Sequence, residues 1–98
     1  MATMKEDARK YLANVPEEYV FRCHDSCVFK NLRELRDGLA DMSEENYTYH
    51  ANTEKNDFSN WVSDIIQDER LAVDLKNAKS RAEAVNRVGN RITALSRR

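Results

Sequence analysis

Residues 57–66, with the sequence DFSNWVSDII, decide the fold of this chain. The apolar residues of this segment are spaced by three and four positions: Phe58, Trp61, Val62, Ile65 and Ile66. This spacing places them on one face of an α-helix, and so regular an apolar face is more often buried than exposed. The segment therefore predicts a helix that lies at the centre of the protein and turns Trp61 toward the core.

Capping residues mark the start of further helices on both sides of this segment. Five residues fit the N-cap position of a predicted helix: Asn31, Ser43, Asp57, Asp68 and Ser80. Glu34 and Glu83 follow the first and the last of these by three residues, as in a capping box. A further amphipathic helix over residues 4–14 is expected to end before Pro16, because the residue that precedes a proline avoids helical angles.

Residues 19–30 predict a β-hairpin. Two runs of strand-forming residues flank the polar dipeptide at 25–26, which fits a two-residue turn. Such a turn pairs His24 with Cys27. Because successive strand residues point to opposite faces, Cys23 and Cys27 are then expected on opposite sides of the ribbon.

These elements together predict one domain over residues 1–98, with a mainly α (α+β) fold. An N-terminal helix (1–15) leads to the hairpin (19–30) and to a helical body (31–96). About five short helices are expected in all, with the Trp61 helix at the centre. The chain is too short for a second core. Its residues are 41% apolar and 34% charged, and the periodic placement of the apolar ones favours a folded domain over disorder.

The sequence also predicts a cytoplasmic location. No apolar run is long enough to span a membrane, and the first residues lack the apolar stretch of a secretory signal. Cys23 and Cys27 are too few for a disulfide framework, so we expect two reduced thiols. We expect no cofactor, no metal and no membrane partner, and a monomer or a homodimer.

Charge is divided unevenly along the chain. The net charge is −1, but residues 1–75 carry −7 and residues 76–98 carry +6. Arg87, Arg91 and Arg98 lie within about 40° of one another on the predicted last helix. The apolar stripe opposite them is expected to hold Ala82, Val85, Val88, Ile92 and Leu95. Such a basic face can follow phosphates, so nucleic-acid binding is one alternative function, although the isoelectric point near 6.1 disfavours it.

Thiol and imidazole groups gather around the predicted hairpin turn. Cys23, His24 and Cys27, with His50 further along the chain, are residue types that bind zinc or act in nucleophilic catalysis. Cysteines on opposite faces leave fewer than four zinc ligands, and no glycine-rich turn supplies an oxyanion hole. A metal- or thiol-dependent site is the second alternative function. The competing interpretation is a buried Cys23 and a solvent-facing His24.

A second polar group surrounds the start of the Trp61 helix. His50, Asn56 and Asp57 are close in sequence to one another and to Trp61. They could form a small polar pocket with an indole wall, able to hold a ligand or a peptide terminus. They could equally form a structural network, in which Asp57 caps its helix and His50 bonds to the backbone or to Asn56.

Several segments resemble a small family of uncharacterised prokaryotic proteins, frequent in archaea and described as a domain of unknown function. The similar segments lie between Val20 and Leu95: Asn31-Leu-x-Glu-Leu35, Met42, His50, Asn56-Asp-Phe-x-x-Trp61 and Asp68-x-x-Leu-Ala72. The family usually has Asp-Gly where this chain has Asp25-Ser26. Its members occur alone or attached to larger proteins, so the resemblance implies an accessory or binding module. The function we favour is a non-enzymatic protein-interaction module with another protein as partner.

Overall fold

The computed structural model describes residues 3–24 and 27–96, of which most are helical. The α-helices in this part are α1 (Thr3–Leu12), α2 (Leu32–Asp41), α3 (Glu44–His50), α4 (Asp57–Trp61), α5 (Glu69–Asn77) and α6 (Arg81–Ser96). A 3₁₀ turn, η1 (Glu17–Tyr19), precedes the strands β1 (Phe21–Arg22) and β2 (Val28–Phe29), and a π-helical segment, η2 (Val62–Ile66), extends α4. The prediction of a mainly α fold with a small N-terminal hairpin is confirmed.

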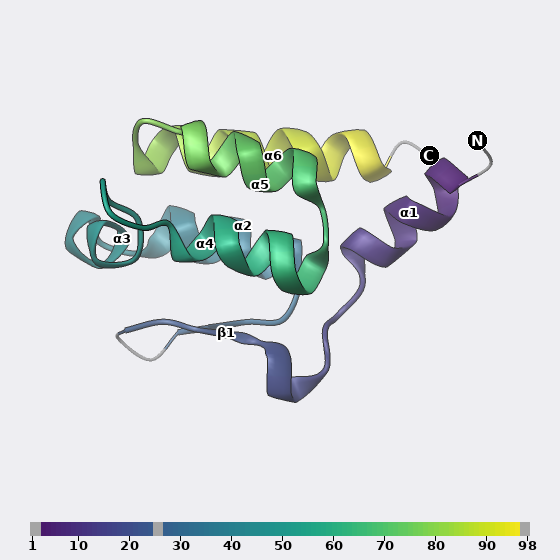
Figure 1. Ribbon diagram of the computed structural model, residues 1–98, viewed down its shortest axis with the longest axis horizontal. Helices are drawn as coiled ribbons and strands as arrows, with labels where there is room; N and C mark the ends of the chain where they lie inside the picture. Colours follow the sequence, from purple (N-terminus) through teal and green to yellow (C-terminus); the bar gives the residue numbers. More distant parts are fainter. Residues whose placement is uncertain (1–2, 25–26, 97–98) are drawn as a thin grey trace.

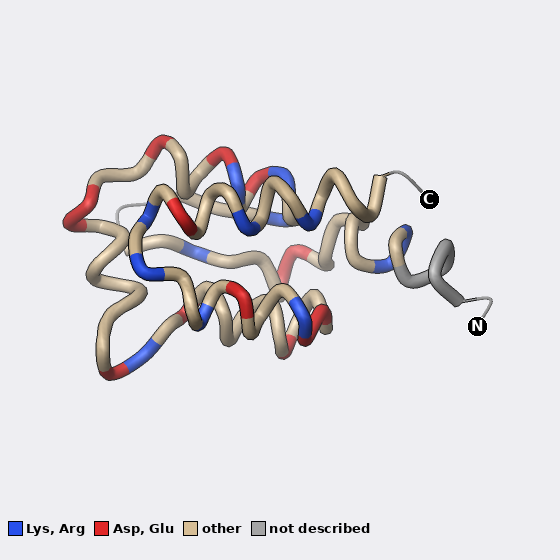
Figure 2. The backbone as a smooth tube through the Cα atoms, turned by 90° about the horizontal axis from the view of Figure 1, so that it is seen from above, with Lys and Arg blue, Asp and Glu red and all other residues tan. Residues whose placement is uncertain are grey.

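The helices form two layers, and the hairpin lies beneath the second (Figure 1). One layer contains α5 and α6, and the next contains α2, α3 and α4. The most extensive contact among the described elements is between α2 and α6, while β2 packs against α2. The α1 helix lies at the end of the molecule, against α6 and α2. Seen from above, acidic and basic positions are interspersed along the chain (Figure 2).

The Trp61 helix lies in the core, as its periodicity predicts. Phe58, Trp61 and Val62 are all buried, and they belong to one continuous cluster of buried side chains. The indole N–H of Trp61 donates to the carbonyl of Tyr19 at 2.8 Å, and its ring meets Phe21 edge-on with centroids 6.0 Å apart. Trp61 therefore joins the helical body to the hairpin.

Most helix starts follow the capping prediction. In each of four helices the predicted cap accepts the backbone N–H three residues on: Asn31, Ser43, Asp68 and Ser80. The exception is α4, where the cap is Asn56, which accepts the N–H of Ser59. The capping role predicted for Asp57 is wrong, because Asn56 already fills it and also donates to the carbonyl of Leu75.

The buried stripe of α6 differs from the predicted one at its start. Val88, Ile92 and Leu95 are buried as expected, but Ala84 is buried in place of Ala82, which is exposed. Residues 84, 88 and 92 are spaced by four, so they share one helix face. This face is rotated away from Ala82 and also leaves Val85 only half-buried.

The hairpin register differs from the prediction by one residue. Phe21 pairs with Phe29, Arg22 with Val28, and the N–H of Cys23 donates to the carbonyl of Cys27 at 2.7 Å. The loop therefore has three residues, 24–26, instead of two, and residues 25–26 lie outside the described residues. A one-residue shift reverses which face a side chain points to. The prediction that Cys23 and Cys27 lie on opposite faces is consequently wrong.

Candidate functional site

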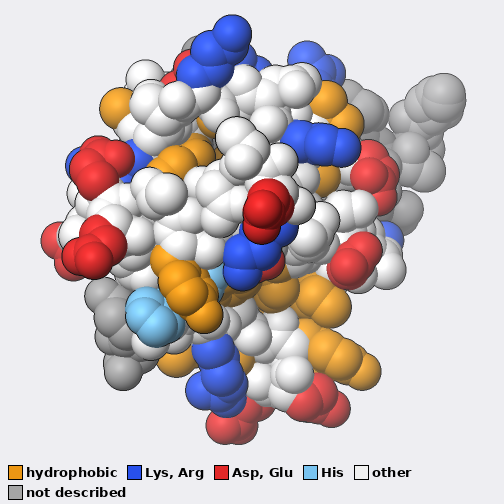
Figure 3. Space-filling model, turned by 60° about the vertical axis from the view of Figure 1, so that its left-hand side comes forward, with side chains coloured by type: hydrophobic (Ala, Val, Ile, Leu, Met, Phe, Trp, Pro, Cys, Tyr) orange, Lys and Arg blue, Asp and Glu red, His pale blue; other side chains and the backbone are white. Residues whose placement is uncertain are grey.

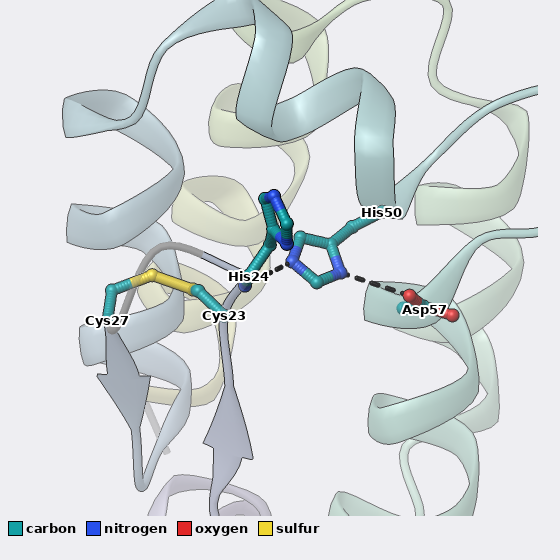
Figure 4. Close-up of a disulfide and its surroundings, with 5 residues drawn as sticks. All are labelled: Cys23, His24, Cys27, His50 and Asp57. Carbon is teal, nitrogen blue, oxygen red and sulfur yellow. Dashed lines mark hydrogen bonds and ion pairs between the residues drawn. A yellow bond between two sulfur atoms is a disulfide. The ribbon is translucent and has the colours of Figure 1, made fainter.

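A disulfide closes the tip of the hairpin. The sulfur atoms of Cys23 and Cys27 are bonded, with the two Cα atoms 4.9 Å apart (Figure 4). The prediction of two reduced thiols is wrong for this structure, because the three-residue loop places the cysteines side by side. Cys23 is buried against the core and Cys27 is half-buried, so Cys27 is the more accessible of the two.

His50, at the end of α3, connects this tip to the helical body. Its Nε2 accepts the backbone N–H of His24 at 2.9 Å, and its Nδ1 lies 3.0 Å from Oδ2 of Asp57 (Figure 4). A ring nitrogen that accepts a hydrogen bond carries no proton, so neutral His50 holds its proton on Nδ1 and donates to Asp57. The side chain is buried, with its ring against Phe21 and Phe58. Both ring nitrogens of His50 are thus engaged within the chain.

Asp57 extends these contacts to Lys55. Its Oδ2 lies 3.0 Å from Nζ of Lys55. Burial raises the pKa of Asp57, but the hydrogen bonds of His50 and Lys55 and the charge of Lys55 outweigh burial and hold this pKa below its ordinary value. Lys55 also lies 5.0 Å from the ring centroid of Tyr49, and Tyr49 stacks on His24 with centroids 4.0 Å apart. A continuous set of contacts therefore runs from the hairpin loop to the loop before α4.

The four residues predicted for a polar pocket take three different places. His50 and Asp57 lie together, Asn56 caps α4 and bonds to α5, and Trp61 bonds to the carbonyl of Tyr19. His50 bonds to the backbone, as the network interpretation predicted, and to Asp57 instead of Asn56. This geometry fits a structural network that fastens the hairpin.

A groove of about 830 Å³ lies between residues 51–56, α4 and α5. Its apolar lining residues include Ala51 and Ala72, and its charged lining residues are Glu54, Lys55, Glu69, Lys76 and Lys79. Two of the lining residues, Asn56 and Ala72, belong to segments that the sequence had already pointed to. The groove itself could not be predicted from the sequence, because its two walls are about twenty residues apart in the chain. The one local feature of the sequence that coincides with the groove is the spacing of asparagines at positions 52, 56 and 60.

The three lysines of the groove differ in their surroundings. Lys55 is held by Asp57, as described above. Within the part of the chain that the structure describes, the ammonium groups of Lys76 and Lys79 lie in no ion pair, and both residues are exposed. Glu69, on the same helix as Lys76, accepts the hydroxyl of Ser63 at 2.7 Å. Two cationic side chains at this groove are thus available to an anionic partner.

Arg91, from the predicted basic face of α6, is an internal ion-pair partner. Its guanidinium donates to both carboxylate oxygens of Asp68, at 2.8 and 3.2 Å. Asp68 is 1% exposed and also caps α5. A buried carboxylate needs such a partner, so Arg91 holds α5 against α6.

Arg87 is also paired inside the chain. It donates to Glu83 at 2.7 Å and lies 3.5 Å from Asp74 of α5. The hydrogen bond from Arg87 lowers the pKa of Glu83. Arg98, the third predicted residue of the basic face, lies outside the described residues. Acidic and basic side chains are interspersed on the surface in Figure 3.

Comparisons with known proteins add no relative. A scan against protein-family models matched no family, and searches of curated proteins and of solved structures found no match. The resemblance to the family of unknown function therefore stays a prediction. Across residues 3–24 and 27–96, no helix is long and apolar enough to cross a bilayer. The same residues bring together no group of three His, Cys, Asp or Glu side chains that could hold a metal ion.

Proposed function

We propose that the protein is a non-enzymatic interaction module whose groove binds a short, extended, acidic segment of another protein. The observation that carries the proposal is the groove between residues 51–56, α4 and α5, with its two unpaired lysines. Its volume of about 830 Å³ is that of a site for a few residues or a small ligand. A concave site of this size suits a single segment better than a large flat interface.

The charges at the groove determine the kind of segment. Lys76 and Lys79 are both exposed, on a chain whose first 75 residues carry −7. Asn60, also exposed in the lining, can donate to and accept from a peptide backbone. An extended acidic peptide fits both features. Its acidic side chains can pair with the lysines, and its backbone amides can bond to Asn60.

The thiol and imidazole groups support binding over catalysis. One ring nitrogen of His50 accepts from the hairpin and the other contacts Asp57 of α4, and the two cysteine sulfurs are bonded to each other. The ion pairs of Arg87 and Arg91 likewise occupy two residues of the alternative nucleic-acid surface. The groove retains exposed cationic groups and is therefore the better supported surface.

Contact with so small a site is expected to be weak. Interfaces that bury less than a standard area belong to transient complexes. We expect a dissociation constant between roughly 10 μM and 1 mM, which suits a module that acts together with other contacts.

The test is a titration with a blocked hexapeptide of alternating Glu and Ser, followed by amide and side-chain NMR shifts. The expected shifts are confined to the groove, at Asn60, Lys76, Lys79 and their neighbours. A Lys/Ser peptide of the same length is expected to cause none. Equal shifts with both peptides, or shifts on a different surface, would contradict the proposal.

Charge-reversal variants supply the matched control. Lys76→Glu with Lys79→Glu is expected to weaken binding of the acidic peptide by at least about tenfold, because like charges then face each other. Arg9→Glu with Lys10→Glu changes the net charge equally, on α1 at the other end of the molecule. This control is expected to bind nearly as well as the wild type. An equal loss in both double variants would show that only the overall charge matters.

A further inference from the structure

We infer that the Cys23–Cys27 disulfide is a reversible thiol–disulfide exchange site, and that it takes low-molecular-weight thiols such as cysteine-containing peptides. The bond joins the two ends of the hairpin loop, with Cys23 buried at the edge of the core cluster and Cys27 outside it (Figure 4). Cys27, which follows the loop, is half-buried and within reach of solvent. This inference does not depend on the proposed peptide groove.

The difference in burial between the two sulfurs sets the direction of attack. A reagent thiolate approaches Cys27 more easily than Cys23, which packs in the core cluster. Attack on Sγ of Cys27 forms a bond from Cys27 to the reagent and breaks the bond to Cys23. The Sγ of Cys23 leaves as a thiolate and takes a proton from water.

A second reagent thiol completes the reaction. Its thiolate attacks the reagent sulfur of the mixed disulfide and releases Cys27 as a thiolate, which is then protonated. In total, two reagent thiols are oxidised to one disulfide, and the protein disulfide is reduced to two thiols. An excess of the oxidised reagent reverses both steps.

Opening the bond has a defined structural consequence. Each strand of the hairpin has only two residues, so the disulfide and the pairing of Cys23 with Cys27 do much to hold the loop. When the bond opens, the N–H of His24 is held less firmly against Nε2 of His50. His50, which bonds to both His24 and Asp57, is then also held less firmly, so its contact with Asp57 is expected to change as well.

The protein is expected to be opened while it remains folded. In reduced glutathione without denaturant, thiol titration should find two thiols per chain, and circular dichroism should keep its helical signal. The NMR signals of His24 and of the His50 ring should shift, and oxidised glutathione should restore them. Thiols that react only in denaturant, or reduction that leaves the His24 and His50 signals unchanged, would overturn the inference.

Two single-cysteine variants test the direction of attack. Cys23→Ser leaves Cys27 free, and Cys27→Ser leaves Cys23 free. With oxidised glutathione, the free Cys27 is expected to form the mixed disulfide at least about tenfold faster than the free Cys23, because it is more accessible. Equal rates in two folded variants would contradict this order. Wild-type protein, trapped with an alkylating reagent during reduction, provides the same comparison without a mutation, as mass spectrometry then shows which cysteine carries the glutathione.

Discussion

The contact between α2 and α6 and the tip of the hairpin are held together by different kinds of interaction. The α2–α6 contact is made by fully buried aliphatic side chains, such as Leu35 and Val88. Around the hairpin tip, three further contacts add to the packing: the disulfide, the hydrogen bond from the N–H of His24 to His50, and the hydrogen bond between His50 and Asp57. Apolar packing responds little to pH or to thiols, whereas each contact at the tip responds to one of them. The fold thus combines an inert body with a chemically sensitive tip.

The largest effect is expected where the two regions meet, at Trp61. Trp61→Ala removes a buried ring and the hydrogen bond to Tyr19, and should lower the free energy of unfolding by about 3–5 kcal/mol. Trp61→Phe keeps a ring and loses the bond, so a smaller loss is expected. Urea unfolding measures both variants. An unchanged midpoint for Trp61→Ala would mean that the body does not depend on this junction.

A substitution at Arg91 tests whether the helical body also depends on the ion pair between Arg91 and Asp68. Arg91→Ala leaves the carboxylate of Asp68 buried without its partner, and we expect a loss of about 3 kcal/mol. Arg87→Ala is the control, since its pairs are more exposed and surface pairs contribute at most about 1 kcal/mol. Thermal unfolding of both variants gives the comparison. Equal losses of stability in the two variants would show that the burial of Asp68 does not determine the cost of removing its partner.

The two glycines give a matched pair for the packing of the hairpin on α2. A Cβ at Gly38 would collide with the ring of Phe29, which is buried and cannot move aside. Gly38→Ala is therefore expected to cost about 1–3 kcal/mol. At Gly89 the nearest side-chain atom is Cδ of Arg36 at 3.7 Å. Gly89→Ala should stabilise α6 by about 0.5–1 kcal/mol, because alanine is the better helix former. A gain in stability at both sites, by calorimetry, would contradict the tight contact at Gly38.

The smallest effect concerns the pH dependence of the tip. The pKa of Asp57 is lower in the folded chain than in the unfolded one. Its stabilising contribution is thus present above about pH 4 and is lost as the pH falls through the folded pKa. Asp57→Asn should cost about 1 kcal/mol at pH 7 by urea unfolding, and this difference from the wild type should shrink at pH 3.

A surface carboxylate provides the control for that measurement. Asp37 pairs with Arg36, but its side chain is 71% exposed. Asp37→Asn is expected to change stability little at either pH. If the difference in stability between Asp57→Asn and wild type stays constant from pH 7 to pH 3, the ionised Asp57 carboxylate and its pair with Lys55 are not its source.

The helical body could be predicted from the sequence better than the hairpin tip. Apolar periodicity identified the Trp61 helix, and capping residues identified the starts of α2, α3, α5 and α6, because both signals are local. At α4, two neighbouring cap-forming residues, Asn56 and Asp57, competed, and the sequence alone did not decide between them. Residue type and closeness in sequence also identified four candidates for a metal- or thiol-dependent site: Cys23, His24, Cys27 and His50.

The remaining part of the site depends on information that is not local. One additional residue in the hairpin loop reverses the direction of the cysteines, and the alternating pattern of the short strands was too weak to exclude it. The groove requires residues 51–56 and α5 to meet, which depends on how the helices pack. Likewise, the partners of Arg87 and Arg91 lie partly on α5 and could not be inferred from the pattern of α6.

Amide hydrogen exchange compares the two regions most directly, in oxidised protein and in protein reduced by a small thiol. The N–H of His24 is expected to be protected in the oxidised protein and to exchange at least about tenfold faster after reduction. The amides of α2 and α6, such as those of Leu35 and Val88, should keep their protection in both states. A His24 amide that is unprotected from the start, or an equal loss of protection in α2 and α6, would contradict the separation of a packed body from a chemically held tip.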